Sequence, residues 1–134
     1  MKITEYIPFI AKEFQEIKED YKLSWNKDNN EYLISLSNEF VDIEFSTERG
    51  EFNTNMSIIF TDVKKDQYYH IWDIQEKKGI QNLEDVLSSE EKVESKKHKE
   101  TIMYIIYIYS RLLGNYCQDM LSGDFSQVGP GLSN

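Results

Sequence analysis

The spacing of apolar residues changes its period twice along this chain, and this change limits the possible folds more than any other feature. Over residues 3–20, apolar side chains recur at three- and four-residue steps, as in an amphipathic helix. From about residue 31 to residue 74 the spacing becomes two, which is typical of strands. After residue 75 the helical spacing returns. The chain is therefore predicted to begin with a helix, continue as strands and end in helices.

Four strands are expected in the middle of the chain. The first three contain the alternating residues of 32–36, 41–45 and 52–60, and the fourth is the segment YYHIWDI, 68–74. The dipeptide Arg49-Gly50 predicts a hairpin turn. Strands joined by short turns run antiparallel. We therefore expect an α+β fold, in which a four-stranded antiparallel sheet is packed by an N-terminal helix and a long C-terminal helix.

The segment after the strands predicts a short helix near 82–88 and a long helix from about 91 or 96 to 121. Ser88 or Ser89, followed by acidic residues, suits the beginning of a helix. The long helix is apolar over so much of its circumference that it must be covered on more than one side. A chain of 134 residues is the size of one domain. We expect a single α+β domain over 1–134, with a flexible C-terminal tail from about 127.

The net charge of −9 restricts the choice of partner. Nucleic acid is not expected as a ligand, because phosphate binding needs lysine and arginine gathered on one face. An acidic protein is attracted to a basic one, and the field of its charges speeds their encounter. The charge therefore predicts a basic protein partner and no nucleic acid.

The sequence also predicts the compartment. Cys117 is the only cysteine, so no internal disulfide can form, which fits a reducing environment. Glu5 interrupts the N-terminal region early, and no signal peptide is expected there. The most apolar stretch, 102–109, is far shorter than the ~20 residues that a bilayer requires. We expect a cytoplasmic protein that does not enter a membrane.

The segment LSGDFS, 121–126, resembles a small catalytic motif but is predicted to be the end of a helix. Gly123 falls where the helical spacing stops, a place where glycine adopts a left-handed conformation without steric cost. Asp124 can bond the backbone two residues on, and Phe125 can fold back on the last helical turn. Because Asp124 has no neighbour to act as an acid, base or nucleophile, the turn is favoured.

No residue pattern predicts catalysis, a cofactor or a metal. His70, His98 and Cys117 are too far apart in sequence for ligand spacing, and neither HExxH nor CxxC occurs. His98 lies in a charged segment, and Cys117 lies in the apolar helix, where a free cysteine behaves as a small hydrophobic residue. The glycines form no phosphate-binding loop. We expect a protein that is not an enzyme.

A face of the sheet away from the helices is the predicted binding surface. Asp42, Glu44 and Glu48 place carboxylates on the outward side of the second strand and its hairpin. The fourth strand has two alternating sets of side chains, either of which can face the helices: Tyr69, Ile71 and Asp73, or Tyr68, His70, Trp72 and Ile74. Aromatic residues beside acids on an exposed sheet form a protein-binding surface. The hypothesis assigns partner binding to five residues: Asp42, Glu44, Glu48, Tyr69 and Asp73.

The helix IMYIIYIYSRLLGNYCQDM, the LSGDFS that follows it and the acidic antiparallel sheet together resemble a small bacterial immunity protein of the polymorphic or contact-dependent toxin systems. The resemblance implies a cytoplasmic, non-enzymatic inhibitor that binds one cognate toxin domain tightly and blocks it. It implies no fixed catalytic positions, so no residue roles follow from it. The expected oligomeric state is a monomer or a weak homodimer.

Two other classes of function are compatible with the sequence. One is a small-molecule-binding regulatory domain, or a small enzyme, that uses a crevice between the sheet and a helix and needs polar groups converging in a pocket. The other is a structural subunit, which would have a flat apolar face for self-association. These alternatives differ from the immunity hypothesis in where they place the functional surface.

Overall fold

The computed structural model describes residues 2–27, 29–47, 56–98 and 102–133. Its sheet contains six antiparallel strands that follow one another in chain order. They are β1 (Ser24–Trp25), β2 (Leu33–Ser37), β3 (Val41–Thr47), β4 (Met56–Asp62), β5 (Gln67–His70) and β6 (Leu132–Ser133). The predicted α+β class with an antiparallel sheet is confirmed, but the predicted number of strands is wrong. The additional strands β1 and β6 have two residues each, too few to produce an alternating pattern.

The predicted N-terminal helix over 3–20 is confirmed as three consecutive helical pieces. They are the 3-10 helix η1 (Ile3–Tyr6), α1 (Ile7–Glu13) and α2 (Gln15–Asp20). Pro8 lies in the first turn of α1, where its missing N–H costs nothing. The helix is interrupted at Phe14, whose ring is fully buried and packs edge-on against Phe45 of β3 at 5.1 Å.

The predicted fourth strand over 68–74 is too long. The strand β5 ends at His70, and α3 (Ile71–Lys77) begins at the next residue. Ile71 and Ile74 are three residues apart and both are buried, which a helix permits and a strand does not, because a strand points them to opposite faces. The strand prediction failed because bulky residues at every position conceal the change from one period to the other.

The helices after α3 are shorter than predicted. The short helix expected near 82–88 is the 3-10 helix η2 (Leu83–Val86). The long helix is divided into α4 (Ser89–Lys96), α5 (Ile102–Tyr116) and α6 (Gln118–Leu121). The predicted serine cap is confirmed: the Ser88 hydroxyl accepts from the Glu91 amide while the Glu91 carboxylate accepts from the Ser88 amide.

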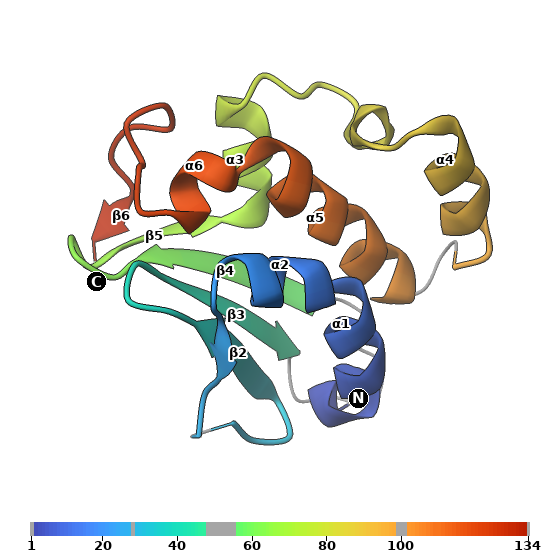
Figure 1. The fold of residues 1–134 in the computed structure, drawn as a ribbon, viewed down its shortest axis with the longest axis horizontal. Coiled ribbons are helices and arrows are strands. Elements are labelled where there is room, and N and C mark those ends of the chain that lie inside the picture. The colour runs from blue at the N-terminus through green and yellow to red at the C-terminus, as the bar shows by residue number, and fades with distance from the viewer. Residues whose placement is uncertain (1, 28, 48–55, 99–101, 134) are drawn as a thin grey trace.

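The core lies between the sheet and one layer of helices. Figure 1 shows α1, α2, α5 and α6 gathered on one side of the sheet. Every second strand residue points into this layer and is buried: Ile34, Leu36, Val41, Ile43, Phe45, Ile58, Phe60 and Tyr69. From α5 and the residues that follow it, Ile106, Leu112, Leu113 and Cys117 close the core. The opposite side of the sheet is therefore not covered by any of the four helices.

The segment expected to be a flexible tail from about 127 runs back along the sheet. Val128 is buried, and β6 pairs with β5 through Ser133 opposite Gln67 and Leu132 opposite Tyr68. The Tyr69 hydroxyl donates to the Gly129 carbonyl at 2.5 Å, and the Lys77 ammonium donates to the Pro130 carbonyl at 3.1 Å. Strand pairing and side-chain contacts thus attach this segment to β5 and α3.

Within the residues that the structure covers, no helix is both long enough and apolar enough to cross a membrane.

Candidate functional site

The face of the sheet turned away from the helices carries the predicted acids. Strand register aligns its side chains in rows across the sheet: Ser35, Glu44, Ile59 and His70 form one row, and Ser37, Asp42, Thr61 and Tyr68 the next. We call this surface the open face. Its strand positions are Leu33, Ser35, Ser37, Asp42, Glu44, Ser46, Ser57, Ile59, Thr61, Tyr68 and His70. None of these described positions holds a lysine or an arginine.

The two acids of β3 are half-buried and lie two residues apart on the same face. Burial raises the pKa of Asp42 above its ordinary value, and a hydrogen bond with the Ser35 side chain partly offsets this effect. The pKa of Glu44 is also raised, first by burial and then by repulsion from Asp42. Ionised carboxylates at these positions are therefore poorly solvated, and no described strand position of the open face supplies a compensating cation.

An aromatic cluster occupies the other side of the open face. It consists of Tyr68, His70 and Trp72. The His70 and Trp72 rings are stacked, with centroids 4.4 Å apart and planes 4° apart, and Tyr68 meets His70 edge-on at 5.8 Å. The Nδ1 atom of His70 is buried without a hydrogen-bond partner among the described residues, so ring contacts orient this imidazole. Trp72 is 53% exposed at the beginning of α3. A rigid and exposed tryptophan is a frequent anchor of protein interfaces.

Two of the five predicted binding residues, Tyr69 and Asp73, do not lie on the open face, and a third lies outside the described residues. Tyr69 is only 2% exposed and lies in the core, where it is stacked on Phe125. Asp73 lies in α3 and not on a strand. Glu48 lies outside the described residues. Asp42 and Glu44 are the two that the structure places together on the open face.

The residues that sequence reasoning missed are those of the alternative set, Tyr68, His70 and Trp72. The alternation of β5 was visible in the sequence, but it did not show which set faces the helices. Pairing between strands answers this, because Tyr69 lies opposite Phe60, and Phe60 lies opposite Ile43. All three are buried, so the even-numbered aromatic residues of β5 point outward.

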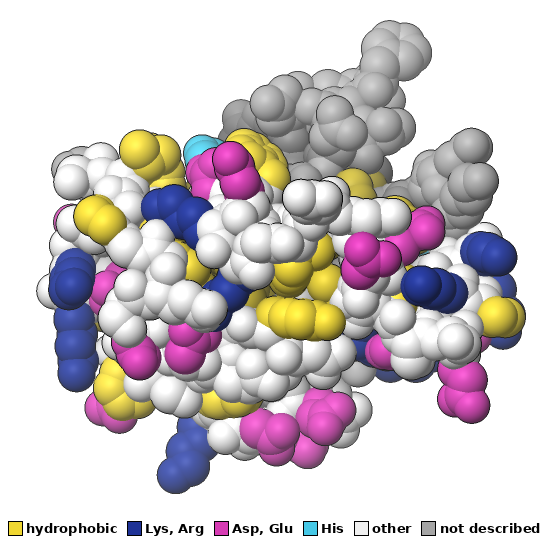
Figure 2. Space-filling model, turned by 90° about the horizontal axis from the view of Figure 1, so that it is seen from above, with side chains coloured by type: hydrophobic (Ala, Val, Ile, Leu, Met, Phe, Trp, Pro, Cys, Tyr) yellow, Lys and Arg dark blue, Asp and Glu magenta, His cyan; other side chains and the backbone are white. Residues whose placement is uncertain are grey.

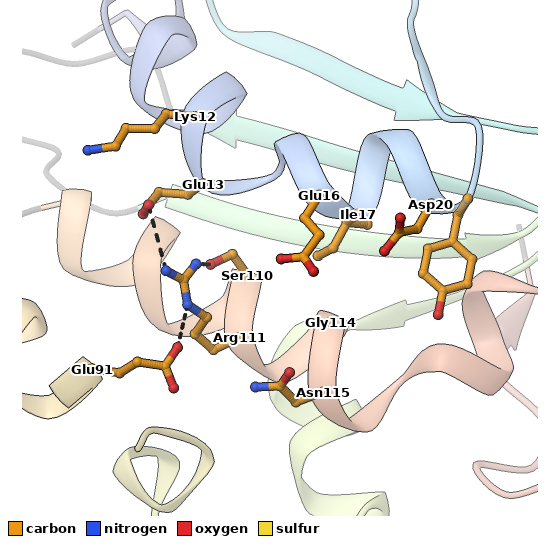
Figure 3. Close-up of a pocket in the computed structure, with 11 residues that line it drawn as sticks. Lys12, Glu13, Glu16, Ile17, Asp20, Glu91, Ser110, Arg111, Gly114 and Asn115 are labelled. Atoms are coloured by element: carbon orange, nitrogen blue, oxygen red, sulfur yellow. Dashed lines mark hydrogen bonds and ion pairs between the residues drawn. The ribbon is translucent and has the colours of Figure 1, made fainter. Parts of the chain in front are cut away.

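A separate polar pocket of about 340 Å³ lies between α1–α2 and α5, with α4 at one end (Figure 3). Arg111 of α5 lies at its centre. Its Nε donates to Glu91 at 2.6 Å, one terminal nitrogen lies 3.8 Å from the Glu13 carboxylate, and the other donates to Ser110 at 2.9 Å. The guanidinium also lies 4.3 Å from the centroid of the Tyr107 ring. The pocket's arginine is thus engaged on all sides by the protein.

The charged groups of this pocket connect helices to one another, because Arg111 of α5 pairs with Glu13 of α1 and Glu91 of α4. Burial alone would raise the pKa of Glu91, but hydrogen bonds from Ser88 and from Arg111 lower it overall, so the ion pair is charged at neutral pH. The Ser110 hydroxyl donates to the Tyr107 carbonyl. Glu16 and Asp20 point into the same space from α2 (Figure 3). The pocket lies between helices, whereas the crevice considered from the sequence would lie between the sheet and a helix.

Cys117 and His98, the other residues considered for catalysis or metal binding, pack against the protein interior or a neighbouring ring. Cys117 is fully buried, and burial raises the pKa of its thiol to about 12. His98 contacts the Phe9 ring edge-on at 5.1 Å. No group of three histidine, cysteine, aspartate or glutamate residues within the described ranges could hold a metal ion.

The LSGDFS segment has the predicted turn. Gly123 has φ +96, and the Asp124 carboxylate accepts from the Ser126 amide at 3.0 Å. The Phe125 ring packs on the sheet, 5.9 Å from the Phe60 ring and 5.6 Å from the Tyr69 ring. This turn therefore directs the chain from α6 toward the edge of the sheet.

The surface on the helical side differs from the open face. Figure 2, seen from the side where Figure 1 places α3, α4 and α5, shows acidic side chains along several margins and basic side chains interspersed with them. Mixed charges of this kind are typical of a solvated surface.

Comparison with known protein-family models, with curated proteins and with solved structures finds no match to this chain.

Proposed function

We propose that this protein is an immunity-type inhibitor, which binds a basic toxin domain with the open face and blocks it. The observation that carries the proposal is the composition of that face. It combines the half-buried acids Asp42 and Glu44 of β3 with an aromatic cluster in which Tyr68 and His70 are half-buried and Trp72 is exposed. A solvated sheet face usually carries both acidic and basic side chains. The described strand positions of the open face carry carboxylates, hydroxyls and rings, but no lysine or arginine. Contact with a cationic surface would place positive charges opposite these carboxylates and favour binding.

The two halves of the open face would serve different steps of binding. Exposed or half-buried carboxylates attract a basic partner over a distance of about one Debye length, and they therefore act on the association rate. Trp72 is large, rigid and already stacked on one side, so little conformational entropy is lost when a partner covers it. Its burial would mainly slow dissociation.

The test is co-expression with a candidate toxin-like domain, sought in the neighbouring reading frame, followed by kinetics with the purified domain. The unaltered chain should restore bacterial growth and bind the domain in surface plasmon resonance. Trp72→Ala should raise the dissociation rate at least tenfold, because a central tryptophan contributes about 2 kcal/mol or more to an interface. The control is Val93→Ala, which removes an exposed apolar side chain (62%) from α4, away from the open face.

Circular dichroism and melting temperatures of both variants must match the unaltered protein, since Trp72 is too exposed to support the core. Tyr69→Ala, in contrast, should lower the melting temperature because it removes a buried ring. Failure of the unaltered protein to bind or to protect would overturn the proposed function.

A further inference from the structure

A groove runs along the exposed side of α3, beside the aromatic cluster. It has a volume of about 590 Å³ and is lined by Trp72, Gln75, Glu76, Gly79, Ile80 and Gln81. We call it the α3 groove. It combines one aromatic wall, one carboxylate, two amides and one aliphatic side chain. It is continuous with the open face through Trp72, which belongs to both surfaces.

The aromatic wall is available on one side only. One face of the Trp72 ring is covered by His70, with planes 4° apart, and among the described residues no other ring contacts its second face. Since 53% of Trp72 is exposed, this second face is open to a ligand. Glu76 follows Trp72 by four residues in the same helix, so the two side chains are neighbours on its surface. The groove therefore holds a ring face and a carboxylate side by side.

The charge of the groove is negative because the nearby lysines are turned elsewhere. The Lys77 ammonium donates to the Pro130 carbonyl and lies 5.4 Å from the centroid of the Tyr69 ring. The Lys78 ammonium is 5% exposed and bonds both oxygens of Asp119 at 2.9 Å. Among the described residues none forms an ion pair with Glu76. The one charged residue that lines the groove thus lacks a cation.

We propose that the α3 groove binds an arginine side chain of the protein partner, with its guanidinium on the open ring face of Trp72 and its N–H groups donating to Glu76. The aliphatic part of the side chain would lie along Ile80. This inference rests on the proposed function, because a basic domain that covers the open face would bring such a residue to Trp72. The partner residue that contacts Trp72 would then be an arginine.

Arginine fits this groove better than lysine for physical reasons. The guanidinium is planar and weakly hydrated, so it can stack on an indole while it donates two parallel hydrogen bonds to one carboxylate. An ammonium is a compact and strongly hydrated charge, which loses more solvation on the ring and donates to the carboxylate from a single point. A cation over tryptophan at an exposed site contributes about 0.5–1 kcal/mol, which corresponds to a two- to fivefold change in affinity.

The first experiment uses a capped Gly-Arg-Gly-Arg-Gly peptide as the probe and NMR spectra of the full-length, ¹⁵N-labelled protein as the readout. The peptide should shift the indole N–H signal of Trp72 and the amide signals of 75–81. The lysine counterpart should bind about two- to fivefold more weakly, and the citrulline counterpart, which is planar but uncharged, more weakly still. Trp25→Phe assigns the indole signals, because the chain contains two tryptophans.

Two variants test the groove directly. Glu76→Gln and Trp72→Leu should each weaken the arginine peptide and remove its preference over lysine, while Glu90→Gln, an exposed acid of α4, should change nothing. Shifts located around Glu16 and Asp20, or equal binding by Glu76→Gln, would overturn the inference. So would a dimer in analytical ultracentrifugation that dissociates in Trp72→Leu, because a second copy would then be the occupant.

Kinetics with the toxin-like domain separate this inference from the proposed function. If the domain binds tightly but its dissociation rate is unchanged by Glu76→Gln, the groove is not the arginine site and the inhibitor role stands. If the domain does not bind at all while the arginine peptide still occupies the groove, the proposed function fails and the site stands.

Discussion

Asp42 and Glu44 are half-buried and so lack full hydration, and no described strand position of the open face provides a cation. Burial raises the pKa of both groups, and mutual repulsion adds to the effect at Glu44. A carboxyl with a raised pKa binds its proton more tightly in the folded than in the unfolded chain. Folding stability therefore falls as the pH rises through these raised pKa values. The two acids cost stability at neutral pH, which a surface reserved for a cationic partner would explain.

Neutralising these acids should stabilise the free protein. We expect the double variant Asp42→Asn, Glu44→Gln to unfold at a higher urea concentration at pH 7, with a gain of up to about 1 kcal/mol. The gain should disappear below about pH 3, where both carboxyls are protonated in the folded and in the unfolded chain. Glu39→Gln is the matched control, since it removes the same charge from an exposed loop beside β3. A loss of stability at pH 7 would contradict the account of these residues.

Gly123 is required for a reason that goes beyond its backbone conformation. Its φ is +96, and a Cβ atom added there would lie 2.8 Å from Cδ1 of Phe40. Gly79 also has a positive φ, +76, but an added Cβ would meet nothing within 4 Å. The two glycines separate backbone strain from steric overlap.

Gly79→Ala should destabilise the protein by about 1 kcal/mol, and Gly123→Ala by about 2–4 kcal/mol, because the second variant adds a steric clash to the strain. Urea denaturation measures both. Equal losses would mean that the Phe40 ring moves aside without cost.

At the scale of the elements, one lysine joins α3 to the end of the chain. Lys78 lies at the C-terminal end of α3, and its ammonium bonds both carboxylate oxygens of Asp119 in α6 and the side-chain oxygen of Gln127. Because the lysine side chain is 5% exposed, its charge depends on these partners. The contact holds α3, and with it Trp72, against α6 and the C-terminal segment.

Lys78→Met should therefore destabilise the fold by about 1–3 kcal/mol, the cost of leaving the partly buried Asp119 without its cation. The added substitution Asp119→Asn should recover part of this loss, so a double-mutant cycle should give a coupling above about 1 kcal/mol. The exposed pair Lys2 and Glu31, with side chains 50% and 57% exposed, is the control and should show almost no coupling. A coupling as small as that of the control pair would show that the contact between Lys78 and Asp119 does not stabilise the fold.

At the scale of the whole molecule, the distribution of charge matters as much as the total of −9. The helical side carries charged side chains of both signs (Figure 2), whereas carboxylates replace this mixture at the described strand positions of the open face, which hold no lysine or arginine. A basic partner is therefore attracted to one side of the molecule in particular. This asymmetry would orient the encounter before any contact is made.

The association rate with the proposed basic partner should accordingly fall tenfold or more as the ionic strength rises, while the dissociation rate changes little. Asp42→Lys with Glu44→Lys should reduce the association rate most strongly at low salt, and Glu39→Lys, which reverses one charge outside the open face, should reduce it much less. Surface plasmon resonance at two salt concentrations measures all of these rates. An association rate independent of salt would contradict electrostatic attraction by the open face.

The sequence by itself determined the class of the fold and many of its elements. Apolar spacing predicted the helix over 3–20, the strands around Ile34, Ile43 and Ile58, and the apolar stripe of α5, because each element repeats its pattern over several turns or pleats. The glycine at 123 and the cap at Ser88 were also predicted, since both depend on local backbone chemistry. Asp42 and Glu44 could be placed on the outward side of β3 from alternation alone.

Only the tertiary structure decided which aromatic residues belong to the proposed binding surface. A strand with bulky residues at every position has two equivalent faces, and local chemistry does not distinguish between them. The choice came from the neighbouring strand, where Phe60 lies opposite Tyr69 and draws it into the core, which leaves Tyr68 and His70 outside. The turn from β5 into α3 then placed Trp72 against His70 and set Asp73 in a helix. These outcomes depend on contacts between residues distant in sequence, and burial of a shared core selects among them.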